Sequence, residues 1–165
     1  MAVINERLGE IRLNSFGTKM KIVRYNSSDD VSVEFMDEHH YSTTTNYSNF
    51  KNGNIKNPYD KTIFGIGYLG NGKYATKINR VMLESYRVWY DMMRRCYSIK
   101  SKEKFSAYFG ICSVAEIWHN YQNFAEKIFC SPITECIVLK CVFLHRNVLI
   151  CYLRKNQICM AYLMV

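Results

Sequence analysis

The stretch VMLESYRVWYDMMRRCY, residues 81–97, decides how the middle of this 165-residue chain folds. Apolar side chains recur in it at spacings of four and three residues: Met82, Tyr86, Trp89, Met93 and Cys96. This spacing places them along one side of an α-helix, which makes a turn about every 3.6 residues. We therefore predict an amphipathic helix over residues 81–97 that buries this stripe in a core.

A second amphipathic helix is predicted to begin at Ser113. Ser113 and Glu116 have the spacing of a capping box, in which the two side chains satisfy backbone amides at the helix start. Apolar residues then continue at helical spacing: Val114, Ile117, Trp118, Tyr121, Phe124 and Ile128. Both tryptophans are most simply core residues, which pack helix on helix or helix on sheet.

Residues 1–60 are predicted to form a small β-rich domain. Residues 20–25 and 31–35 alternate apolar and polar side chains, as strands with one buried face do. The polar cluster at residues 26–30 between them indicates a turn. The expected fold class is α+β, with an antiparallel sheet of SH3-like size followed by a loop-rich basic segment and the two helices in residues 61–126.

The net charge of +8 is concentrated in one part of the chain. Residues 51–104 hold 12 basic and 4 acidic side chains, whereas residues 1–50 hold 5 basic and 7 acidic ones. A solvated surface can carry such an excess, and a face that binds a polyanion requires it. Both interpretations are open on charge alone.

The candidate nucleic-acid contacts are Lys51, Lys56, Lys73, Tyr74, Lys77, Arg80, Arg87, Arg94 and Arg95. Arg80, Arg87 and Arg94 are seven residues apart and are therefore expected on one helix face, with Asp91 able to pair with Arg87 or Arg95. The glycine-rich run before Lys73 is not a phosphate-binding P-loop, because Tyr74 stands where that motif has Ser or Thr. Its glycines are expected to permit tight turns.

Residues 127–165 differ in composition from the rest of the chain. They contain five of the seven cysteines and one carboxylate side chain, Glu135. An odd number of cysteines clustered at one end favours a reducing compartment over a disulfide framework. No run of 18 apolar residues indicates a membrane span. We expect an irregular apolar tail; a β-hairpin or helix with structural cysteines is the alternative.

No catalytic, metal-binding or cofactor-binding residue is predicted. The histidines are His39, His40, His119 and His145. His39 and His40 follow Asp37 and Glu38 in an acidic turn, where adjacent histidines seldom bind one ion together, and His119 has no carboxylate at a useful local spacing. Cys96 and Cys112 have no CxxC partner. The sequence therefore favours a protein that is not an enzyme.

Residues 65–126 resemble phage-encoded HNH-like (His-Me finger) homing endonucleases, which often end in an AP2-like DNA-binding domain. The resemblance rests on GYLGNGKY at residues 67–74, on the helical stretch, and on Cys112, Val114, Glu116, Trp118 and YQNFA at residues 121–125. It implies a DNA-binding function. The family's nuclease segment, with its general base and metal ligand, would follow this region and is absent in frame.

The tail preserves a trace of that missing segment. When each codon boundary is moved by one base, codon degeneracy permits residues 136–157 to spell YSPEMCIFTQECINMLFTKKS, which is similar to the family's sequence after its nuclease part. We therefore predict a deletion with a change of reading frame near residues 125–127. The coding DNA tests this prediction.

Three functions follow as hypotheses. The first is a phage-encoded protein of the bacterial cytoplasm that binds double-stranded DNA, related to a homing endonuclease but without cleavage activity. The second is an anti-CRISPR-like inhibitor, in which the net acidic residues 1–50 meet a basic groove of a host nuclease. The third is an active HNH-like endonuclease that uses His119 or His39.

Overall fold

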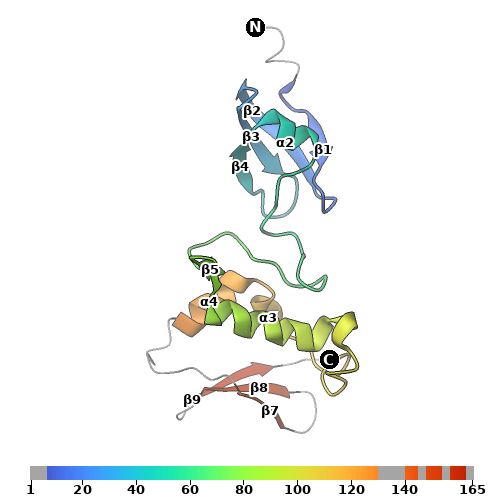
Figure 1. Cartoon of the computed structure of the whole chain (residues 1–165), viewed down its shortest axis with the longest axis vertical. Helices are drawn as coiled ribbons and strands as arrows, with labels where there is room; N and C mark the ends of the chain where they lie inside the picture. The colour runs from blue at the N-terminus through green and yellow to red at the C-terminus, as the bar shows by residue number, and fades with distance from the viewer. Residues whose placement is uncertain (1–6, 130–139, 145–147, 154–156, 163–165) are drawn as a thin grey trace. The chain divides into compact units, whose positions relative to one another are not determined.

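The computed structural model describes residues 7–129, 140–144, 148–153 and 157–162 of the chain. The chain divides into two compact units, Met1–Asp60 (unit 1) and Lys61–Val165 (unit 2). The combination of an antiparallel sheet with separate helices confirms the predicted α+β class (Figure 1). Within the described residues, none of the helices has the length and apolar character needed to cross a membrane.

Unit 1 is a four-stranded antiparallel sheet whose strands lie in the order β1-β2-β3-β4. The strands are β1 (Ile11–Leu13), β2 (Lys19–Ser27), β3 (Asp30–Phe35) and β4 (Ser42–Thr45), and the short helix α2 (Tyr47–Lys51) follows them. The predicted alternation is present in β3 and at the start of β2, and a register shift between Ile22 and Arg24 returns Tyr25 to the buried face. The core of unit 1 consists of Met20, Ile22, Tyr25, Val31, Val33 and Phe35, joined by Phe50 and Ile55. Burial of alternate residues fixes the register, since a shift by one residue would expose the whole core face.

A buried polar cluster joins the end of unit 1 to the β1–β2 turn. Asp60 is 7% exposed, and its carboxylate accepts hydrogen bonds from Asn14 Nδ2 at 2.8 Å and from the hydroxyl of Thr18. Asn14 Oδ1 in turn accepts the backbone amides of Phe16 and Thr18. These bonds satisfy the buried polar groups and attach residue 60 to a turn more than 40 positions earlier in the chain.

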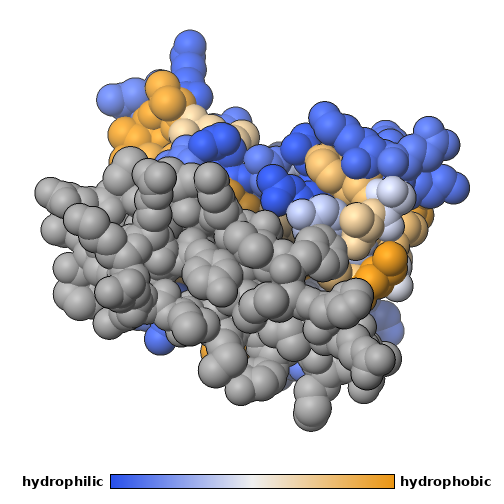
Figure 2. Space-filling view, turned by 90° about the horizontal axis from the view of Figure 1, so that it is seen from below, coloured by the Kyte–Doolittle hydropathy of each residue, from blue (hydrophilic) through white to orange (hydrophobic). Residues whose placement is uncertain are grey.

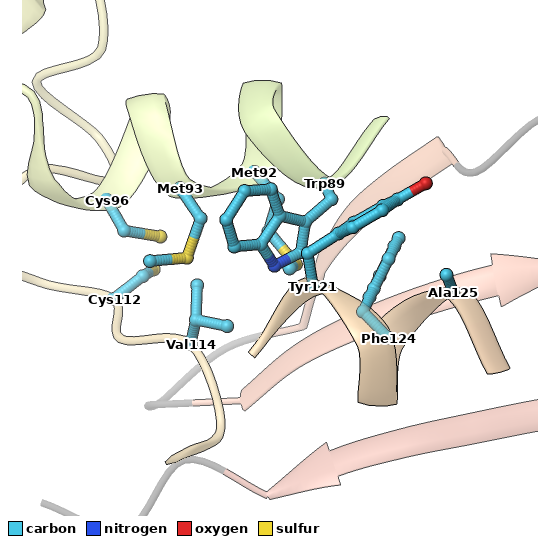
Figure 3. Packing of buried hydrophobic residues seen from close by; sticks show 9 residues of the cluster. All are labelled: Trp89, Met92, Met93, Cys96, Cys112, Val114, Tyr121, Phe124 and Ala125. Carbon is cyan, nitrogen blue, oxygen red and sulfur yellow. The ribbon is translucent and has the colours of Figure 1, made fainter. Parts of the chain in front are cut away.

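Unit 2 is built around α3 (Glu84–Tyr97) and α4 (Tyr121–Phe129). The hairpin β5 (Lys77–Ile78) and β6 (Val81–Met82) precedes α3, and the single turns η1 (Ile99–Ser101) and η2 (Glu116–Trp118) lie between the helices. Figure 3 shows the core, to which α3 contributes Trp89, Met92, Met93 and Cys96, the loop before η2 contributes Cys112 and Val114, and α4 contributes Tyr121, Phe124 and Ala125.

The first predicted helix is correct in its core face but starts too early. Trp89, Met93 and Cys96 are buried, and Tyr86 packs against them. Met82 is instead exposed and lies in β6, where it pairs with Lys77. Residues 81 and 82 leave the helical pattern because the hairpin takes their backbone, so α3 begins at Glu84.

The second predicted helix is divided. Ser113 does not cap it; η2 is a single 3-10 turn, and α4 begins only at Tyr121, where Asn120 Oδ1 accepts the amide of Gln122 at 2.9 Å. The helix is interrupted because tertiary donors take the carbonyls between the two parts. Trp89 Nε1 donates to the Trp118 carbonyl at 2.7 Å, and the amide of Tyr68 donates to the His119 carbonyl at 3.0 Å.

Two further expectations need correction. Ile117, expected on the apolar face of the second helix, is 64% exposed. The tail is not irregular where the structure describes it, because β7 (Lys140–Leu144), β8 (Val148–Leu153) and β9 (Gln157–Tyr162) form an antiparallel sheet in the order β7-β8-β9. The expectation failed because β-branched and aromatic residues favour strands even without a clear alternation.

Candidate nucleic-acid interface

The start of α4 holds the basic loop at residues 69–76 in place. Gln122 Oε1 accepts the amide of Tyr74 at 2.9 Å, and Gln122 Nε2 donates to the carbonyls of Tyr74 and Leu69 at 3.0 and 3.4 Å. Tyr121 adds a bond from its hydroxyl to the Ala75 carbonyl at 2.9 Å. Burial raises the pKa of Tyr121 above its ordinary value, so the hydroxyl stays protonated and keeps donating. Two side chains thus organise a loop that has no regular structure of its own.

The glycines of this loop allow close approach as well as turning. A Cβ on Gly72 would lie 2.5 Å from Gln122 Oε1, and a Cβ on Gly70 would lie 2.2 Å from Asn120 Oδ1. Gly70 also has a φ of +70°, which is costly for residues with a side chain. The run GYLGNGKY therefore packs closely against the start of α4, and the positive φ of Gly70 agrees with the expected tight turn.

Replacing Gly70 with alanine is expected to destabilise unit 2 by about 2–4 kcal/mol, because backbone strain adds to the clash with Asn120. The control is Gly110→Ala, since Gly110 has a similar φ of +74° but no atom within 4 Å of the added Cβ. Urea denaturation followed by tryptophan fluorescence measures both variants, because both tryptophans lie in unit 2. Equal losses in the two variants would show that the contact with Asn120 contributes nothing.

The loop leads into a tight hairpin that presents two cations. Asn79 and Arg80 connect β5 to β6 with φ values of +50° and +66°, the conformation of a two-residue type I′ turn. Glycine is the preferred residue at the second position, so an arginine there costs about 1 kcal/mol in backbone strain. Lys77 and Arg80 are both exposed, and neither has an ion pair within the residues that the structure describes. Backbone strain at a residue with a charged side chain, such as Arg80, favours a functional role for that side chain.

The arginines of α3 are arranged differently from the prediction. Arg80 does not share their helix face, because it lies in the hairpin turn. Arg87 forms a bidentate ion pair with Glu84, whose hydrogen bonds raise the pKa of Arg87 above its ordinary value. Asp91 pairs with Arg94 at 2.9 Å, and not with Arg87 or Arg95 as expected. Ion pairing three residues apart therefore offsets much of the positive charge of this helix.

The other candidate residues are spread over both units. Arg95 is half-buried and lies over the rings of Phe105 and Tyr108, with its guanidinium carbon 6.0 and 5.9 Å from their centroids. Lys73 is exposed and lies over the Tyr74 ring at 5.1 Å, while Tyr74 itself packs against the core of unit 2. Lys51 and Lys56 are exposed residues of unit 1. Lys73, Lys77 and Arg80 thus form a group within one loop-and-hairpin segment, which we call the basic hairpin (residues 70–82).

His119 belongs to the packing of unit 2. Its Nε2 donates to the Val114 carbonyl at 3.0 Å, and its ring meets Tyr97 edge to face. Burial lowers the pKa of His119 below its ordinary value, more than the Val114 bond and Glu116 raise it. His39 stacks on Tyr59 with centroids 3.8 Å apart. Across the described ranges, no three His, Cys, Asp or Glu side chains are grouped as metal ligands would be.

The lowered pKa of His119 predicts that unit 2 loses stability in acid. Above the unfolded pKa of about 6.5, His119 is neutral in both states and its packing is fully present. As the pH falls from there toward the lower folded pKa, the unfolded state binds the proton first, and the free energy of unfolding decreases. Urea denaturation between pH 7.5 and 5 measures this slope, which His119→Gln should reduce. An unchanged slope in that variant would assign the acid sensitivity to another group.

Several apolar residues remain exposed among the described residues. Figure 2 shows hydrophobic and hydrophilic residues side by side on one face of the chain. The exposed apolar residues of unit 2 include Ile78, Val81 and Met82 of the hairpin. Those of unit 1 include Leu8, Ile11, Leu13 and Phe16. Ile78, Val81 and Met82 were not among the candidate contacts from sequence, although the pattern Lys-Ile-Asn-Arg-Val-Met is a weak hairpin signal. Gln122 and Tyr121 were assigned no supporting role, because a side chain that binds a distant loop leaves no local pattern.

Comparison of the chain with known protein families, curated proteins and solved structures finds no match.

Proposed function

We propose that this chain is a double-stranded DNA-binding protein of phage origin that acts in the bacterial cytoplasm, a relative of homing endonucleases without their nuclease segment. The observation that carries the proposal is the basic hairpin, in which the exposed Lys73 lies on the loop that Gln122 and Tyr121 fix, and the exposed Lys77 and Arg80 follow in the β5–β6 hairpin. A fixed loop loses little conformational freedom on binding, so more of the phosphate attraction is retained as affinity. The resemblance of residues 65–126 to the family supports the same function. An SH3-like fold of unit 1 and the shifted reading frame of the tail remain predictions.

The test is a titration of duplex DNA with the full-length protein at several salt concentrations. Phosphate contacts release counterions, so the logarithm of the affinity should fall linearly with the logarithm of the salt concentration. Binding that is absent at about 50 mM salt would reject the proposal. A metal-dependent nicking assay on the same preparation tests the endonuclease alternative, for which His119 and His39 offer no grouped metal ligands in the described chain.

One observation favours protein binding as a second candidate function. Leu8, Ile11, Leu13 and Phe16 are each more than half exposed, and Ile11 and Leu13 lie opposite Lys21 and Lys19 in the sheet. A partner on this surface would present apolar and acidic groups, which differs from the basic groove expected from the net charge of residues 1–50. An inhibitor of a host nuclease would lose its effect in a cleavage assay when Ile11 and Leu13 are both replaced by serine.

A further inference from the structure

The basic hairpin carries an aliphatic pair beside its cations. Ile78 and Val81 lie directly opposite each other in the β5–β6 register, so their side chains leave the same face of the ribbon. They are 56% and 69% exposed. Lys77 and Met82 form the next pair and leave the opposite face. One face of the hairpin is therefore apolar, next to the strained cation at Arg80.

We propose that the hairpin enters the major groove of duplex DNA and places Ile78 and Val81 against the methyl groups of thymine. This inference rests on the proposed DNA-binding function and adds the element that contacts the bases. The major groove, about 12 Å wide, admits a two-stranded ribbon and displays the C5-methyl group of thymine, whereas the minor groove, about 6 Å wide, does not display this methyl group.

The distribution of charge agrees with this placement. With the aliphatic face on the floor of the groove, Lys77 starts from the opposite face, and its flexible four-carbon stem is long enough to bend toward the phosphates at the groove rim. Arg80 lies in the turn at the end of the ribbon, within reach of the same phosphates. Both cations meet negative charge, and neither has to be buried unpaired. A protein surface of mixed charge would satisfy the two exposed cations less completely than two rows of phosphates.

The chemistry of the base edges then determines the preference. The C5-methyl of thymine is the apolar group that the major groove presents, and the remaining base-edge groups are hydrogen-bond donors and acceptors. Ile78 and Val81 have no polar atoms, so they gain by contact with thymine and lose by covering polar edges. We expect stronger binding to A·T-rich duplexes that retain this methyl group.

The experiment compares full-length protein on poly(dA-dT) and on poly(dA-dU), which lacks the methyl group. Wild type should bind the uracil polymer about fourfold more weakly for each methyl group that it contacts. The double variant Ile78→Ser with Val81→Ser should bind both polymers equally and keep the salt dependence of wild type. Ile111→Ser is the matched control, because Ile111 is 57% exposed in the same unit and should leave the preference intact.

The outcomes separate this inference from the proposed function. Equal affinity of wild type for the two polymers, with salt-dependent binding retained, overturns the groove placement and leaves phosphate binding standing. The absence of salt-dependent binding to either polymer overturns both. A thymine preference that persists in the double variant assigns the methyl contact to other residues and also overturns the inference.

Discussion

Replacing Lys77 and Arg80 together with alanine weakens binding to duplex DNA about 30-fold at ~0.15 M salt. Each phosphate contact contributes roughly fivefold at this salt through counterion release, so two contacts multiply to this value. The slope of log affinity against log salt should fall in magnitude by about 1.8. Fluorescence anisotropy of a labelled duplex, titrated at several salt concentrations, measures both quantities.

Substitutions of the arginines of α3 are the comparison for the Lys77 and Arg80 variant. Arg87→Ala with Arg94→Ala should weaken binding less than about fivefold, because Glu84 and Asp91 already offset these charges. Conversely, Glu84→Gln with Asp91→Asn should strengthen binding, since it leaves both arginines available to phosphates. A larger loss from the helix variant than from the hairpin variant would move the interface from the hairpin to α3.

Arg80→Gly tests whether weaker DNA binding could result from misfolding of the hairpin. Glycine is favoured at this position of a type I′ turn, so the substitution should preserve or slightly raise the stability of the hairpin. DNA affinity should nevertheless fall about fivefold, because one phosphate contact is lost. A variant that is at least as stable as wild type and yet binds less tightly shows that the arginine is held at a strained position for its side chain.

Replacing Trp89 with alanine is expected to unfold unit 2 or to bring it close to unfolding. Trp89 is completely buried between α3 and α4, and truncation of a large buried aromatic costs about 3–5 kcal/mol. The Trp118 carbonyl also loses its donor, at a cost of about 1–3 kcal/mol if it stays buried. This total is comparable to the entire stability of a small domain, about 5 kcal/mol at the lower end.

Urea denaturation followed by circular dichroism, with hydrogen exchange resolved along the chain, measures this loss. The amides of α3 and α4 should lose protection, while those of β2 and β3 keep theirs, because the two cores share no residue. Ile117→Ala is the control, since this exposed neighbour of Trp118 should change stability by less than about 0.5 kcal/mol. Trp89→Phe separates the ring from the hydrogen bond. A loss below about 1 kcal/mol for Trp89→Ala would show that the core does not depend on the indole.

The sheet of unit 1 and the core face of α3 could be predicted because their signal is local. Alternation in β2 and β3 and the four-three spacing around Trp89 each follow from burying one face of a regular element. The boundaries were wrong where distant groups compete for the backbone. The hairpin takes Met82 out of the helical stripe, and Trp89 and Tyr68 take carbonyls that a continuous helix from Ser113 would need.

The candidate interface was likewise predictable in part from the sequence and in part only from the structure. Composition alone located the basic segment, and every cation of the basic hairpin was among the predicted contacts. Which cations are available for phosphate depends on pairs that spacing leaves ambiguous, such as Asp91 with Arg94 and not with Arg87.

The sequence by itself determined the α+β class, the two core faces and the position of the positive charge, because burial and charge act through residue type and short-range period. The tertiary structure alone decided where the helices begin, which arginines are neutralised and how the loop at residues 69–76 is held. These features depend on contacts between residues up to about 50 positions apart, such as Gln122 with Tyr74. Local periodicity carries no record of such contacts, because either partner could bond elsewhere until the chain has folded.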